Sequence, residues 1–242
     1  MEAESKTSNK RECAPPKYLK MSKRVEKQLN SFKYKGEPIK VTIGTLVLTC
    51  LCILFLIVAT FTQVTLTHPN VWMEAFSSLQ EGFEPANDLL RTYRYIPQIP
   101  VVFFIIALLG RKFGVLSILG YIVLGMFFPI FALGGGISYI FEYGFGYILA
   151  FIPVIILVGT LLKVKTDFFR ILLWVTVGVF AIHILGVLYL LFVSVLRHAP
   201  MEFVSSWIAS QSGVQIVYDV MFSLLAVYLG RLMRKFLWII MC

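Results

Sequence analysis

Long apolar runs, separated by short polar segments, follow one another along the chain from residue 41 onward. A helix needs roughly 20 apolar residues to cross a hydrocarbon core about 30 Å thick. The pattern therefore predicts an all-α integral membrane protein. Composition agrees, because 58% of the residues are hydrophobic and only 14% are charged, which excludes an ordinary soluble domain. We expect about six transmembrane helices, at 41–66, 96–110, 113–131, 144–162, 169–196 and 214–232.

Polar residues concentrate in two segments outside these runs. Residues 1–40 are rich in lysine and contain proline, and such segments bury too little apolar surface to fold. We expect a basic, disordered cytoplasmic tail there and one transmembrane domain at 41–242. The second polar segment, 67–95, is predicted to be a loop with a short interfacial helix near 71–79. The apolar end of the chain, 236–242, either extends the last helix or lies in the membrane interface.

The 22 lysine and arginine residues are distributed very unequally across the predicted membrane. If the amino-terminus lies inside, 19 of them fall on the inner side, and only Arg91, Arg94 and Arg197 remain outside. Inner loops of membrane proteins carry an excess of lysine and arginine. We therefore predict cytoplasmic termini and a multi-pass protein of the plasma or inner membrane. This topology and anionic lipid account for the net charge of +9 without a nucleic-acid partner.

Two segments depart from the pattern of regular spans. The run 96–110 covers only about 22 Å as a helix, and Pro97 and Pro100 oppose helix continuation toward the preceding residues. Such irregular backbone is tolerated at membrane depth where it lines a wet cavity. The second segment is Gly134–Gly136, which permits unusual backbone angles and close approach of a ligand. Both segments lie on the outer side in the predicted topology.

The last predicted span carries a third unusual feature, a stripe of polar residues. Gln211, Gln215, Asp219 and Ser223 recur every four residues and therefore share one helix face. A carboxylate inside a span is expensive and faces the helix bundle or a cavity. Asp219 is either bonded to a neighbouring helix or part of a ligand site. Because all three features fall on the outer half of the membrane, we expect a small-molecule pocket open to the outside.

The sequence offers no constellation of catalytic residues. No lysine and serine or threonine follow the glycines as in a phosphate loop, so we expect no ATP hydrolysis, no enzyme activity, no metal and no cofactor. His183 stands alone in the fifth predicted span, either as a neutral packing histidine or as a lining or relay residue. Tyr139, Tyr143 and Tyr147 are either interface-belt aromatics or pocket walls.

The stretch from Ile96 to about Gly159 resembles the BioY family, the substrate-binding S components of energy-coupling-factor biotin transporters. It contains the segments Ile-Pro-Gln-Ile-Pro from Ile96, Gly-Arg-Lys-Phe-Gly from Gly110, Phe-Ala-Leu-Gly-Gly-Gly from Phe131, and Gly-Tyr-Ile-Leu-Ala-Phe from Gly146. The family shows segments of these four types in the same order. The resemblance implies an S-component-like helix bundle, membrane uptake of biotin, and partnership with a T component and ATPase subunits.

The chain departs from the family in its last helix. The family's helix resembles Pro-Gly-Asp-x-x-Lys, and the resemblance implies that its Asp and Lys bind biotin. Here Asp219 matches the Asp, whereas Tyr218 replaces the Gly and Phe222 replaces the Lys. A buried ligand carboxylate still needs positive charge or several donors. Either Arg94 or the backbone N–H groups of Gly134–Gly136 supply them, or Arg94 is only a solvated anchor at the membrane interface.

These observations together define a set of candidate residues and a set of alternatives. The leading hypothesis is a biotin-binding membrane transport component. The alternatives are an S component for another small ligand, and a membrane assembly or scaffold protein without a transported substrate. The expected substrate-binding residues are Arg94, Gln98, Gly134, Gly135, Gly136, Tyr139, Tyr147, Gln215 and Asp219.

Overall fold

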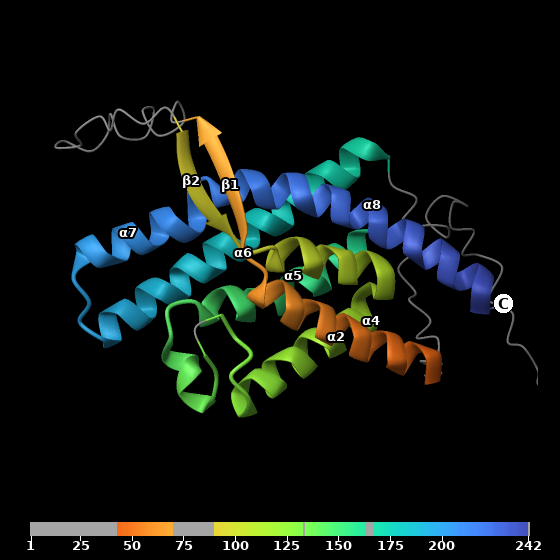
Figure 1. Ribbon diagram of the computed structural model, residues 1–242, viewed down its shortest axis with the longest axis horizontal. Coiled ribbons are helices and arrows are strands. Elements are labelled where there is room, and N and C mark those ends of the chain that lie inside the picture. The colour runs from red at the N-terminus through yellow and green to blue at the C-terminus, as the bar shows by residue number, and fades with distance from the viewer. Residues whose placement is uncertain (1–42, 70–89, 133, 163–166, 242) are drawn as a thin grey trace, which may run out of the picture. The chain divides into compact units, whose positions relative to one another are not determined.

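The computed structural model describes residues 43–69, 90–132, 134–162 and 167–241. The predicted tail at 1–40, the predicted interfacial helix at 71–79 and Arg91's side chain lie outside what it describes. Within the described ranges the chain is predominantly helical (Figure 1). This agrees with the predicted helical membrane protein, apart from one two-stranded hairpin.

Three helices lie close to their predicted positions. Helix α2 runs Ile43–Phe61, α5 runs Phe145–Leu161 and α6 runs Phe168–Leu196. Each of these segments is apolar almost without interruption. A helix that is hydrophobic on all sides is a buried or membrane-spanning helix, which is why the apolar runs predicted these three elements. The first predicted span extended to residue 66, which was too long, because α2 ends at Phe61 and a strand begins three residues later.

The predicted second and third spans form one element, α4 (Gln98–Phe127), with a break at Gly110. Gly110 has φ 72° and ψ −172°, a conformation that favours glycine. The chain doubles back there (Figure 1), since a Cβ added to Gly114 would lie 3.9 Å from the Ile105 side chain. Nine residues of straight helix would separate these positions by about 13 Å. The boundary expected between the two spans is therefore a sharp turn between two helical halves.

A β-hairpin occupies the ends of the segment predicted to be a polar loop. Strand β1 (Val64–Pro69) pairs antiparallel with β2 (Leu90–Tyr95), and Val64 lies opposite Tyr95. β-Branched and aromatic residues are frequent in both strands, and these residue types favour extended backbone. The loop expectation was therefore wrong for the nine strand positions inside it, 67–69 and 90–95. The hairpin joins α2 to α4 and ends at Tyr95.

The last part of the chain folds into two helices, α7 (Met201–Ser212) and α8 (Gln215–Met241). Pro200 precedes the first residue of α7, where a proline does not interrupt the helix. Gly213 follows its last residue and ends the helix. Helix α7 was not predicted, because its apolar residues are too few for a span. Helix α8 includes the apolar end of the chain, so that end extends the last helix.

Four stretches are long and apolar enough to cross a membrane in the described part of the chain: α2, α4, α6 and the run Met201–Leu237 through α7 and α8. Helix α5 is apolar but shorter. The count of six spans stays a prediction, because α4 counts once and is divided at Gly110.

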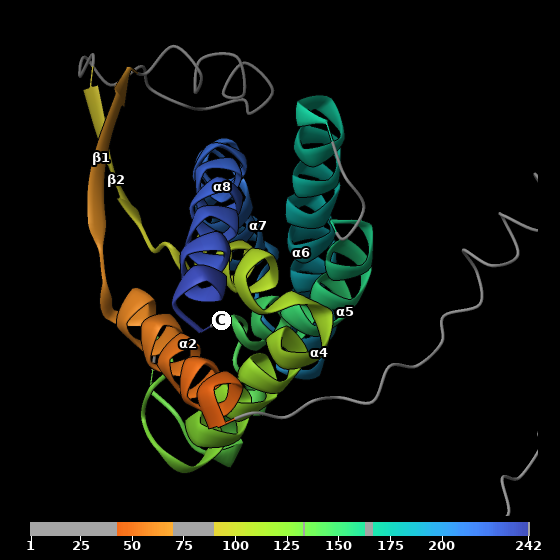
Figure 2. The same cartoon turned by 90° about the vertical axis from the view of Figure 1, so that its right-hand side faces the viewer.

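Helix α8 packs closely against α4, and α6 packs against α5 and α8 (Figure 2). A Cβ added to Gly178 would lie 2.8 Å from the ring of Phe103, and one added to Gly230 would lie 2.8 Å from the carbonyl oxygen of Phe104. The first half of α4 is consequently the centre of the core. The helices on either side of it supply the polar residues of the site.

Candidate functional site

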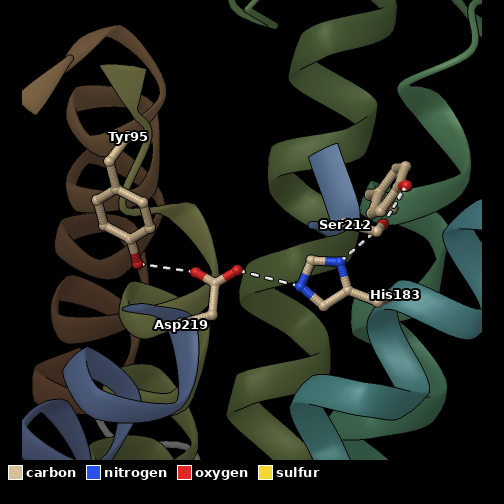
Figure 3. Close-up of polar contacts among 5 residues, drawn as sticks. Tyr95, His183, Ser212 and Asp219 are labelled. Atoms are coloured by element: carbon tan, nitrogen blue, oxygen red, sulfur yellow. Dashed lines mark hydrogen bonds and ion pairs between the residues drawn. The ribbon is translucent and has the colours of Figure 1, made fainter. Parts of the chain in front are cut away.

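A buried carboxylate on α8 is bonded to two other elements. Asp219 is fully buried, and its Oδ1 accepts a 2.7 Å hydrogen bond from the hydroxyl of Tyr95 at the end of β2. Its Oδ2 lies 3.1 Å from Nε2 of His183 on α6 (Figure 3). Gln215, one helical turn earlier, adds a side-chain hydrogen bond. Asp219 thus connects a strand and two helices that are remote in sequence.

The imidazole of His183 extends this contact into a chain of polar side chains. Its Nδ1 lies 3.0 Å from Oγ of Ser212, the last residue of α7 (Figure 3). The same Oγ lies 2.8 Å from the hydroxyl of Tyr147 on α5. His183 is buried, whereas Ser212 and Tyr147 are half-buried. The chain therefore leads from a dry end at Asp219 toward a more accessible end at Tyr147.

Glycines on α5 and α6 determine how closely these helices approach. A Cβ added to Gly186 would lie 2.5 Å from the ring of Tyr147, and one added to Gly146 would lie 2.3 Å from Cβ of Tyr189. Only a residue without a side chain fits at either place. Gly186, one turn beyond His183, lets the Tyr147 ring lie against α6. This contact places the Tyr147 end of the polar chain against the helix that carries His183.

The charge on Asp219 has no arginine or lysine partner among the described residues. His183 is the basic side chain that contacts it. An isolated charge in a low-dielectric interior is very costly, and removal of one partner from a buried pair typically costs about 3 to 5 kcal/mol. Asp219 and His183 are therefore best regarded as one unit that shares a proton.

Aromatic rings surround the Tyr95 end of the site. Phe222, at the position of the family's Lys, lies with its ring 5.3 Å from that of Tyr95 and stacked on Tyr218 at 6.4 Å. Tyr95 is buried, whereas Phe222 is partly exposed. Position 222 thus contributes apolar surface beside Asp219 and no charge.

Gln98 belongs to a second buried polar cluster, three residues after Tyr95. Its Nε2 donates to Oγ1 of Thr60 at 2.7 Å and to the hydroxyl of Tyr121 at 3.3 Å. The Thr60 and Tyr121 hydroxyls are 2.9 Å apart. The cluster joins α2 to both halves of α4. The short segment between Tyr95 and Gln98 therefore connects two polar clusters, and one of them contains Asp219.

The glycine loop packs against the end of α4. Gly134 and Gly136 have φ of 121° and 96°, and the amide of Gly136 donates to the carbonyl of Gly125. A Cβ added to Gly135 would lie 2.1 Å from the carbonyl oxygen of Phe128. The expected backbone angles are present, and the close approach that glycine permits here is to the protein's own backbone. Contact between this loop and a ligand stays a prediction.

The remaining candidates are placed differently. Tyr139 is buried and stacks against Phe131, 4.5 Å between ring centroids, in an aromatic cluster that follows the glycine loop. Arg94 is exposed on β2, and adjacent strand residues point to opposite faces, so Arg94 faces away from the side of buried Tyr95. The structure therefore brings Asp219, Gln215 and Tyr147 into one connected set with His183, and does not bring Arg94 to it.

Polar and aromatic contacts close the end of the bundle next to α7. Arg197 donates to Glu142 at 3.2 Å, and its guanidinium lies 5.3 Å above the ring of Tyr143. The Glu142 carboxylate raises the pKa of Arg197. The Tyr143 ring also contacts Phe203 and Trp207 of α7. Tyr143 is thus a packing residue for α7, the helix that ends at Ser212.

Comparisons with known proteins identify relatives of this arrangement. The model of the BioY family matches residues 95–238, well over half of the chain. The chain is also similar to a crystal structure of the S-component for biotin from an ECF-type ABC transporter. That likeness has a TM-score of 0.57 at 20% sequence identity and covers 82% of this chain and 95% of that chain. Among curated proteins, no relative matches.

Proposed function

The chain belongs to the BioY family, and we propose that it is the substrate-binding component of a vitamin transporter whose ligand is biotin. Family membership agrees with the resemblance seen in the sequence. The family is one of transporter components, so the prediction that the chain is not an enzyme is confirmed. Its apolar helices make it a multi-pass membrane protein.

The observation that carries the proposal is the buried carboxylate inside the matched region. The match spans 95–238 and so includes every member of the polar chain from Tyr95 to Asp219. The ureido ring of biotin presents two N–H donors, and a carboxylate is a strong acceptor for them. Tyr95, His183 and Gln215 together make three hydrogen bonds to the Asp219 carboxylate, which offers about four lone-pair sites. Acceptor capacity for a ligand therefore remains.

The other candidate residues complete the proposed site. Gln98 and Gln215 are buried or half-buried amides next to Tyr95 and Asp219, able to donate and accept. Tyr147 lies at the accessible end of the polar chain. The glycine loop 134–136, Tyr139 and Arg94 remain candidate contacts for the rest of the ligand. We propose a T component and ATPase subunits as partners, because the related S-component is from an ECF-type ABC transporter.

A second candidate ligand class follows from Phe222. Where the family's helix has Lys, this chain presents an aromatic ring stacked on Tyr218. An apolar side chain there would suit a less polar ligand. An S component for a different small molecule is consequently the alternative that the structure favours next.

Equilibrium binding distinguishes a biotin-binding component from an S component for a different small molecule. The full-length protein, purified in nanodiscs, is titrated with radiolabelled biotin in the presence of unlabelled biotin, thiamine or riboflavin. We expect saturable binding at one site that only unlabelled biotin displaces. Absence of saturable biotin binding would overturn the proposal, and tight binding of another vitamin would favour the alternative.

A further inference from the structure

The hydroxyl of Ser212 lies within hydrogen-bond distance of both the Tyr147 hydroxyl and the His183 imidazole, and the three side chains come from three different helices. All three groups can donate a hydrogen bond. Helices α5, α6 and α7 supply one each, so no single helix pattern produces the cluster. Two of its members are half-buried, so the cluster is less deeply buried than Asp219. Convergent donors in a partly dry site are the arrangement that binds an anionic oxygen.

We infer that His183, Ser212 and Tyr147 form the subsite that receives the ligand's carboxylate, with His183 as its cation. Resting on the proposed function, this assigns to His183 a role that no other described side chain at the site can fill. Arg94 faces away on β2, and Arg197 is paired with Glu142 at 3.2 Å. The first half of α4, which packs against α8, contains no titratable residue.

Asp219 orients the imidazole for this role. Nε2 of His183 lies 3.1 Å from Oδ2 of Asp219, so the carboxylate engages that nitrogen and leaves Nδ1 for the ligand side. The other ring nitrogen, Nδ1, then carries a proton that points toward Ser212. The titratable groups around the ring are Tyr95 through Asp219, Tyr147 through Ser212, and Asp219 itself. Of these groups, Asp219 is the one in ion-pair contact with the ring.

The hydroxyl partners allow the ring to change its hydrogen bonding without a change of position. Ser212 and Tyr147 can each donate or accept, so the proton at Nδ1 is satisfied by Ser212 when the site is empty. A ligand carboxylate that arrives from the α7 side can replace Ser212 as acceptor. The two hydroxyls then turn and donate to the same carboxylate, which receives up to three hydrogen bonds.

The test compares biotin with its neutral methyl ester in three single variants. His183→Gln removes the cation and keeps a polar side chain of similar size. We expect it to bind biotin about 10- to 100-fold more weakly and the ester nearly as wild type does, because a charged hydrogen bond is lost only with the acid. His198→Gln, the same change at an exposed histidine, should affect neither ligand. Arg94→Gln tests the competing cation: if Arg94 received the carboxylate, this variant would lose affinity for biotin and little for the ester.

A second readout reports the charge of the ring directly. The chain has three histidines, so His68→Gln with His198→Gln leaves His183 as the single ¹⁵N-histidine signal in labelled protein. We expect the imidazolium pattern, with both nitrogens protonated, when biotin is bound. A neutral ring with biotin bound, an equal loss of both ligands in His183→Gln, or a loss confined to Arg94→Gln would overturn the inference. If wild-type protein binds neither biotin nor its ester, the proposed function fails first, and the inference fails with it.

Discussion

The hydroxyl of Tyr95 donates a 2.7 Å hydrogen bond to Asp219 across 124 positions of sequence. Tyr95 ends a strand outside the helix bundle, and Asp219 lies one turn inside α8. Both side chains are buried. The bond therefore fixes the end of the hairpin to the helix that carries the buried charge. It makes the connection between β2 and α4 part of the site.

Removal of this hydroxyl should weaken ligand binding while the fold persists. Tyr95→Phe keeps the ring and its contacts with Phe222 but takes one donor from the Asp219 carboxylate. A hydrogen bond to a charged group contributes about 1.5 to 3 kcal/mol, so biotin affinity should fall by roughly 10-fold or more. Tyr218→Phe deletes a hydroxyl from the neighbouring ring and serves as the control. Equal affinities of Tyr95→Phe and Tyr218→Phe in a binding titration would show that Tyr95 does not orient Asp219.

The second polar cluster should contribute to stability as a unit. Thr60→Val and Tyr121→Phe each remove one hydroxyl of a buried pair that lies 2.9 Å apart. Because either change leaves the other group and Gln98 with fewer partners, each should lower the free energy of unfolding by about 1 to 3 kcal/mol. The double variant should lose less than the sum of the two. Denaturant unfolding in detergent measures this coupling, and strictly additive losses would mean that the two hydroxyls act independently.

The close contact of α5 with α6 at Gly186 predicts that a larger residue there would disturb the site. In Gly186→Ala the new methyl group would lie 2.5 Å from the Tyr147 ring, which must then move away from Ser212. Overpacking of this kind costs about 1 to 3 kcal/mol. We expect a lower unfolding temperature together with weaker biotin binding. Gly144→Ala is the control, because the nearest atom to its new methyl group is 3.6 Å away. A Gly186→Ala protein as stable as Gly144→Ala would contradict the packing described for α5 and α6.

The apolar runs predicted most of the helical part of the fold. Helices α5 and α6 lie within one residue of the predicted spans, because uninterrupted apolar sequence favours one long buried helix. Helix α7 and the hairpin escaped prediction. Helix α7 is too polar to resemble a span. The strands of the hairpin lie largely within a polar segment whose composition resembles that of a loop. Gly110 was recognised as a boundary, although its positive φ could not be read from sequence.

The site was only partly predictable for a related reason. The four-residue spacing on α8 placed Gln215 and Asp219 on one face, since helical periodicity is local. It could not identify the partners of Asp219, because Tyr95 and His183 come from other elements. His183 had been considered alone, with packing and lining roles both open. Its position beside Asp219 depends on how α6 packs against α8, which no local pattern encodes.

The predicted topology can be tested at two exposed positions. Lys112 lies next to the Gly110 turn, and His198 follows α6 at the other end of its span. With both termini cytoplasmic, a cysteine at 198 should react with a membrane-impermeant maleimide in intact cells. A cysteine at 112 should react only after permeabilisation. Both are introduced into a chain whose four native cysteines are replaced by serine. The reverse labelling pattern would place the Asp219 site at the inner face.

The most direct test of the proposed site is biotin binding by Asp219→Asn. Asparagine keeps the size of the side chain but replaces the carboxylate, whose oxygens bond Tyr95 and His183, with a neutral amide. Asp167→Asn, at the exposed start of α6, is the matched control. Isothermal titration in nanodiscs should give biotin affinity at least about 10-fold weaker for Asp219→Asn and unchanged for Asp167→Asn. The Asp219→Asn protein should still fold, because an amide keeps hydrogen-bonding groups toward Tyr95 and His183, and a cooperative thermal unfolding transition checks this. Wild-type biotin affinity in Asp219→Asn would contradict the account, because Asp219 would then be a packing residue.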